Sequence, residues 1–149
     1  MITLSVGDLR TRTGEEIGTS EWVVIDQARI DAFADVTDDR QWIHVDTERA
    51  NQAPFGSTIA HGFLTLSLVS SMLRSVVAIS GLQMTINYGL NRVRFVSPVP
   101  AGARVRGRVT LQAIDDTTDG GQATWQIAVE REGSDKPCLV AEWLVRYYA

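Results

Sequence analysis

The chain has 149 residues, of which 44% are hydrophobic and 21% charged, with a formal net charge of −4. This length fits one domain over residues 1–149 and is too short for two ordinary domains. The acidic balance argues against a general nucleic-acid-binding protein, and no charge-free apolar run reaches the roughly 18 residues of a membrane-spanning helix. The sequence begins without a basic flank and sustained apolar segment, so we expect a cytoplasmic protein. A lone cysteine, Cys138, fits a reducing compartment.

The first elements predicted along the chain are a strand and two short helices. "WVVI" (22–25) is strand-like, and Asp26 is placed to cap a helix that carries Ile30, Phe33 and Ala34 on one side. "DTERAN" (46–51) predicts a second, shorter helix with Asp46 as its cap.

The longest apolar segment, "GFLTLSLVSSMLRSVVAIS" (62–80), predicts a helix that carries the core. More than half of its helical circumference is apolar, and Arg74 is its only charged residue. The apolar positions are Leu66, Leu68, Val69, Met72, Leu73, Val76 and Val77. We expect a largely buried helix that ends at Gly81.

The sequence after Gly81 is strand-like. "RVRGRVTL" (104–111) and "TWQIAVE" (124–130) alternate apolar and polar residues, turn-rich segments separate the runs, and "LVAEWLVRYY" (139–148) predicts a final strand. One apolar helix followed by at least four antiparallel strands predicts an α+β fold in which the sheet curls around the helix. Such a sheet leaves an edge strand and an open face, so we expect association through the edge or over the helix, with a homodimer as the simplest form.

The stretch "DDRQWIHVD" (38–46) contains the residues of greatest chemical interest. Asp39 and His44 differ in proton affinity, with pKa values of about 4 and 6.5 in model compounds, so together they suit the addition or removal of water. His44 and His61 each stand beside a potential helix start, where Gly62 offers an unobstructed backbone N–H to an oxyanion. The spacing alone still favours a simpler interpretation, with Asp39 as a turn residue and His44 as an ordinary half-buried histidine.

The combination of two motifs changes this balance. "DDRQWIHVD" followed by "APFGSTIAHGFLTLS" (53–67) resembles the hydratase signature of the MaoC-like dehydratase family, the (R)-specific enoyl-CoA hydratases of the hot-dog fold. The matching residues are Asp39, Ile43, His44, Phe55, Gly56, His61 and Gly62, and "NYGLNRVRFVSPVPAG" (87–102) is similar to the family's strand after the helix. Gln41 and Trp42 replace the family's Asn-Pro, which resembles the subgroup of nodulation protein N-like hydratases.

The resemblance implies a role for each matching site residue. Asp39 and His44 would hold the catalytic water, and the Gly62 N–H would bind the thioester carbonyl. Ser70 aligns with a serine that lines the family's active site, although back-bonding within the helix explains it equally well. Gln41 would keep the supporting hydrogen bonds of the family's Asn, because an amide of longer reach can still donate and accept.

The implied reaction is reversible hydration of a trans-2-enoyl thioester, on CoA or acyl carrier protein, to a (3R)-3-hydroxyacyl thioester. It needs no cofactor, and His44, Asp46 and His61 have no recognised metal-ligand spacing. Two alternatives remain, a hot-dog thioesterase and a non-catalytic acyl-thioester-binding protein. Three arginines, Arg92, Arg94 and Arg104, are either contacts for CoA phosphates or a solvated face.

Overall fold

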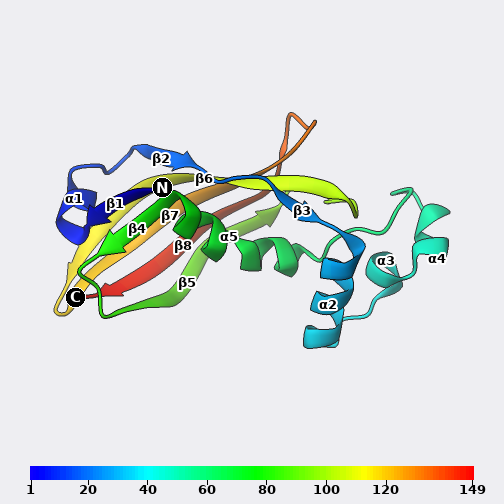
Figure 1. Ribbon diagram of the computed structural model, residues 1–149, viewed down its shortest axis with the longest axis horizontal. Helices are drawn as coiled ribbons and strands as arrows, with labels where there is room; N and C mark the ends of the chain where they lie inside the picture. The colour runs from blue at the N-terminus through cyan, green and yellow to red at the C-terminus, as the bar shows by residue number, and fades with distance from the viewer.

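An antiparallel sheet curves around one long helix in the computed structural model, which describes residues 1–149 (Figure 1). The elements in chain order are β1 (Ile2–Ser5), α1 (Val6–Arg10), β2 (Glu16–Thr19), β3 (Val23–Ile25), α2 (Gln27–Thr37), α3 (Trp42–Val45), α4 (Thr47–Asn51), α5 (Gly62–Val76), β4 (Val77–Ser80), β5 (Met84–Phe95), β6 (Ala103–Thr117), β7 (Gly120–Arg131) and β8 (Pro137–Tyr148). The predicted α+β class is therefore confirmed.

The main sheet has the strand order β2-β6-β7-β8-β5. The short strand β3 also pairs with β6, at residues 103–105, on the N-terminal side of the part that pairs with β2. The long strands β6, β7 and β8 pair antiparallel, with Trp125 opposite both Leu111 and Trp143. The predicted alternation of strand residues is confirmed, because Val105, Val109 and Trp125 are completely buried on the inner face. This face supplies most of the core.

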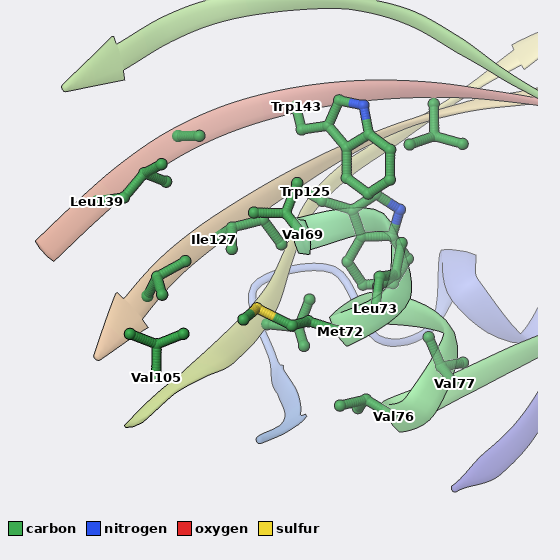
Figure 2. Packing of buried hydrophobic residues seen from close by; sticks show 14 of the residues in the cluster. Val69, Met72, Leu73, Val76, Val77, Val105, Trp125, Ile127, Leu139 and Trp143 are labelled. Atoms are coloured by element: carbon green, nitrogen blue, oxygen red, sulfur yellow. The ribbon is translucent and has the colours of Figure 1, made fainter. Parts of the chain in front are cut away.

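Helix α5 lies against the inner face of this sheet. Figure 2 shows Val69 and Met72 of α5 pointing toward β7 and β6, where Ile127 and Val105 lie. The approach is close, because a Cβ atom at Gly107 of β6 would lie 3.0 Å from the Met72 sulfur. A side chain at Gly107 would thus push the helix away from the sheet.

The end of α5 differs from the prediction. The helix stops at Val76 instead of Gly81, because Val77–Ser80 forms β4 and pairs in parallel with β1, Ile2 facing Val77. The helix is also less buried than expected, since Arg74 and Ser71 are exposed on its outer side. The predicted caps are confirmed: the carboxylates of Asp26 and Asp46 accept backbone N–H groups at 2.9 and 3.0 Å.

Three helices, α2, α3 and α4, gather at one end of the sheet, and the first turn of α5 points toward them (Figure 1). At the other side, β5 is an edge strand whose residues are mostly exposed. No helix here combines the length and the apolar character that crossing a membrane requires.

Candidate active site

His44 is fixed in one tautomer by the segment that precedes α5. Its Nδ1 lies 2.6 Å from the main-chain carbonyl oxygen of Ile59. Because a carbonyl oxygen only accepts hydrogen bonds, Nδ1 carries the proton and Nε2 keeps a free lone pair. The Ile59 N–H in turn donates to the Ile43 carbonyl at 3.0 Å, so this segment and α3 hold each other. In the neutral ring, Nε2 is therefore the basic nitrogen.

Gln27, at the start of α2, is a supporting residue that sequence reasoning did not identify. Its Nε2 group donates to the His44 carbonyl at 2.7 Å and to the Asp31 carboxylate at 2.8 Å. Its Oε1 atom accepts the Thr58 hydroxyl at 2.5 Å. One amide thus joins α2, α3 and the segment before α5, and no spacing along the chain signals this junction.

Asp39 lies in the turn between α2 and α3. Asp38 ends α2 in the left-handed conformation, with φ of 58°, which short polar side chains tolerate better than most others. Arg40 stabilises the turn through ion pairs with Asp35 at 3.0 Å and Asp38 at 3.1 Å. The turn places the exposed Asp39 beside the two histidines: a carboxylate oxygen of Asp39 and one ring nitrogen of each histidine lie within 4.8 Å of one another.

His61 is the N-cap residue of α5 and is only 3% exposed. Its Nε2–H donates to the Asp39 main-chain carbonyl at 2.9 Å, and its Nδ1 has no hydrogen-bond partner. The ring stacks on His44, with centroids 3.7 Å apart and planes inclined by 21°.

Burial lowers the pKa of His44 below its ordinary value of 6.5. The Ile59 hydrogen bond opposes this shift, His61 lowers the pKa further, and the Asp39 carboxylate raises it. Desolvation dominates because it disfavours the charged imidazolium. His44 is consequently neutral at pH 7, which a proton acceptor requires.

Gly62 begins α5 beside His44, and both residues line one cavity of about 420 Å³. Backbone N–H groups of a first helical turn lack partners within the helix, so the Gly62 amide is available to a negatively charged oxygen. Phe55, Phe63 and Phe95 also line the cavity, and all three are exposed. The arrangement combines a base, a backbone donor and apolar walls.

A side chain at position 62 would press on Phe95. A Cβ atom there would lie 2.8 Å from the Phe95 ring, well inside ordinary contact distance. Phe95 comes from β5 and packs edge-on against Phe63, with ring centroids 6.0 Å apart. Gly62 therefore allows an aromatic wall to approach the helix start.

The structure separates Ser70 from this cavity. Ser70 lines a different cavity of about 450 Å³ beside the second half of α5, together with Trp143 and Val145. Its hydroxyl accepts a hydrogen bond from Arg74 at 2.8 Å. Gln41 is exposed at the start of α3 and its side chain makes no capping hydrogen bond. Within one chain, His44 and Gly62 share one cavity and the Asp39 carboxylate lies near His44, whereas Ser70 lines another cavity.

Cys138 also lines the cavity of His44. Its side chain is a protonated thiol and is poorly suited to act as a nucleophile. Burial raises its pKa to about 11, and its Sγ–H donates to the Val129 carbonyl at 3.3 Å. Thiol chemistry requires the thiolate, which is scarce at neutral pH when the pKa is this high.

The geometry of the two histidines is unfavourable for a metal. A metal ion lies close to the plane of each imidazole that binds it, about 2.1 Å from the nitrogen. The His44 and His61 rings are stacked with nearly parallel planes, so one ion cannot lie in both planes at that distance. Asp46, the third residue considered from the sequence, instead caps α4. The side chains of Asp39, His44 and His61 are therefore better arranged for proton transfer than for metal binding.

The chain belongs to the MaoC-like family, whose MaoC like domain matches residues 8–131. It is 51% identical to 3-hydroxyacyl-thioester dehydratase Z of Mycobacterium tuberculosis strain H37Rv, over 97% of both chains. It is 48% identical to nodulation protein N of Rhizobium leguminosarum bv. viciae, over 97% of this chain and 91% of that protein. The subgroup resemblance seen in the sequence is thus confirmed.

A solved structure confirms the hot-dog fold. The (R)-hydratase from A. caviae involved in PHA biosynthesis superposes with a TM-score of 0.74 and 25% identity, covering 89% of this chain and 96% of that one. Dehydration and hydration are the two directions of one reaction, so the dehydratase and the hydratase among these proteins support a hydro-lyase. The site geometry is consistent with that class.

Proposed function

We propose that this protein is an (R)-specific enoyl-thioester hydratase, which adds water reversibly to trans-2-enoyl thioesters and forms (3R)-3-hydroxyacyl thioesters. The observation that carries the proposal is the His44 tautomer. Its Nδ1–H is held by the Ile59 carbonyl, which leaves Nε2 as the basic ring nitrogen, and a carboxylate oxygen of Asp39 lies within 4.8 Å of a ring nitrogen of His44. A water between these two groups has two acceptors for its protons.

The proposed reaction balances with water alone. The water oxygen bonds to the β-carbon, the pair from the double bond moves toward the thioester carbonyl, and an enolate forms. A proton then reaches the α-carbon from the Asp39 and His44 pair, which had taken it from water. No oxidant, reductant or resident cofactor takes part in this sequence.

Gly62 supports the enolate in this proposal. Negative charge develops on the thioester oxygen, and the Gly62 N–H at the start of α5 opposes it together with the helix dipole. One such donor is typically worth about 10²–10³ in rate.

The decisive experiment incubates the protein with crotonyl-CoA and with butyryl-CoA. Hydration removes the enone absorbance of crotonyl-CoA without releasing thiol, and chiral analysis of the product then yields the 3R isomer. Free thiol from butyryl-CoA would instead identify a thioesterase. Binding of crotonyl-CoA without turnover at any pH from 5 to 9 would identify a non-catalytic binding protein. A 3S product would overturn the stereochemical part of the proposal.

The carrier of the acyl group is proposed to be CoA, with acyl carrier protein as the alternative. Arg92 and Arg94 on β5 are exposed and form no ion pair, so they are free to meet phosphates. Arg104 is engaged differently, since it pairs with Glu132 at 3.0 Å and lies over the Trp22 ring. Comparing crotonyl-CoA with crotonyl-loaded acyl carrier protein tests the assignment, and a higher kcat/KM for the latter would reverse it.

The second part of the proposal is a homodimer formed through β5. This strand ends the main sheet, so one row of its backbone groups lacks a partner strand. Its exposed side chains include Met84, Ile86, Tyr88 and Leu90, which is unusual for a surface strand. Sedimentation equilibrium should therefore give a mass of twice 16.4 kDa, and a monomer at micromolar concentration would contradict it.

A further inference from the structure

His61 touches each of the three parts of the proposed site. Its Nε2–H donates to the main-chain carbonyl of Asp39 at 2.9 Å, its ring stacks on His44 at 3.7 Å, and its backbone directly precedes Gly62. Phe33 of α2 packs on the same ring, with centroids 5.0 Å apart.

Packing alone does not explain an imidazole at this position. His61 is 3% exposed and its Nδ1 has no hydrogen-bond partner, which costs stability because a buried acceptor has lost its water. A phenylalanine ring would fill the same space and stack on His44 without that cost. The feature specific to histidine is the Nε2–H that reaches the Asp39 carbonyl.

We infer that His61 is a positioning residue, which holds Asp39 and His44 in the relative placement that binds one water. This inference rests on the proposed function. Asp39 is exposed and lies in a turn, so its carboxylate has few constraints of its own. The tether to the buried N-cap of α5 supplies the missing constraint, and small losses of placement lower turnover sharply.

The stacked pair also limits the protons that the site can hold. Two imidazolium rings at 3.7 Å repel each other, so protonation of one ring disfavours protonation of the other. The charged group facing the stack is Asp39, from the turn after α2; Phe33 of α2 and the Ile59 carbonyl are uncharged. Replacing the His61 ring by an uncharged side chain should therefore raise the pKa of His44.

Two substitutions separate the parts of this role. His61→Phe keeps the stacked ring and removes the donor, whereas His61→Gln places an amide N–H at similar reach and removes the ring. We expect kcat for crotonyl-CoA hydration to fall about 10- to 100-fold in His61→Phe with little change in KM, and to fall less in His61→Gln. Equal activity of His61→Phe and wild type would overturn the inference.

A control and a second measurement keep the test decisive. Val129→Ala, in the core of β7, should lower the melting temperature and leave kcat at 20 °C unchanged, which shows what lost stability alone does. The pKa of His44, followed by ¹⁵N NMR, should rise in both His61 variants and stay constant in Val129→Ala. An unchanged His44 pKa in both His61 variants would contradict the inference even if kcat fell. If the wild-type protein has no hydratase activity, the proposed function fails. The effect of His61 on the pKa of His44 can still be tested in that case, because the NMR titration needs no turnover.

Discussion

The Nδ1–H of His44 donates to the main-chain carbonyl of Ile59 over 2.6 Å, across fifteen positions of the chain. This bond decides which ring nitrogen is available for chemistry. It also ties α3 to the segment that leads into α5, so the His44 imidazole and the helix N-terminus are positioned together.

Asp39→Asn and His44→Gln should each lower kcat by about 10²–10⁴ with almost no change in melting temperature, because both replacements keep the shape and remove proton transfer. The double variant should lose little more than the worse single variant, since both groups act on one water. Enone loss at saturating crotonyl-CoA, measured beside thermal melts, checks all three proteins.

Asp38→Asn is the matched control for that prediction. Asp38 is adjacent, exposed and in the left-handed conformation, which Asn also tolerates, and the Oδ1 atom of Asn can still accept the hydrogen bond from Arg40. Its activity should remain within about twofold of wild type, as expected for an exposed group with no part in proton transfer. Near-wild-type turnover in either Asp39→Asn or His44→Gln would remove the pair from the mechanism.

Acidification should destabilise the protein partly through His44. Burial lowers the folded-state pKa of His44 below the ordinary value of 6.5, so below pH 6.5 the unfolded state binds more protons than the folded state. The contribution of neutral His44 to the free energy of unfolding is complete above pH 6.5 and is lost as the pH falls through the folded-state pKa. Urea unfolding at pH 7.5 and pH 5 should show a smaller loss for His44→Gln than for wild type. An equal loss in both proteins would assign the effect to other groups.

Gly62→Ala should destabilise the protein by about 1–3 kcal/mol, because the added methyl group collides with the Phe95 ring at 2.8 Å. Phe95→Ala in the same chain removes the collision, so the double variant should be more stable than the sum of the single effects predicts, by about 0.5–3 kcal/mol. Gly89→Ala is the control, since a Cβ atom there meets nothing within 4 Å. Additive effects in urea unfolding would show that Phe95 moves away freely.

Leu73→Asp should abolish folding, because Leu73 lies in the core and an unpaired buried charge costs several kcal/mol, roughly the stability of a domain. Ser71→Asp, on the exposed side of the same helix, should fold normally. Circular dichroism melts compare the two. A soluble, cooperatively melting Leu73→Asp protein would contradict the burial of this face.

Binding of enoyl-CoA should weaken as salt is added, because phosphates at an exposed basic rim are screened within about 10 Å at 0.1 M salt. Arg92→Gln and Arg94→Gln should raise the KM for crotonyl-CoA at low ionic strength. Arg104→Gln, already paired with Glu132, should change it less. A KM that stays constant from low to high ionic strength would argue against a phosphate contact.

The sequence by itself determined the local features of this protein. Asp26 and Asp46 predict helix starts because a cap bonds to a backbone N–H three residues away, and strand alternation predicts the inner face of β7 because it depends only on the pleat. The motif that contains Asp39, His44 and Gly62 could also be recognised from the sequence, because these residues lie within 24 positions of one another.

The tertiary structure alone decided the rest, through contacts between segments far apart in the chain. The helix α5 ends at Val76 because β1, more than 70 residues earlier, pairs with the segment that propensity assigns to the helix. Ser70 lies apart from His44 because it points from the second half of α5 toward β8. The stack of His61 on His44 likewise depends on how two segments fold together. The spacing of the two histidines along the chain does not predict that their rings are in contact.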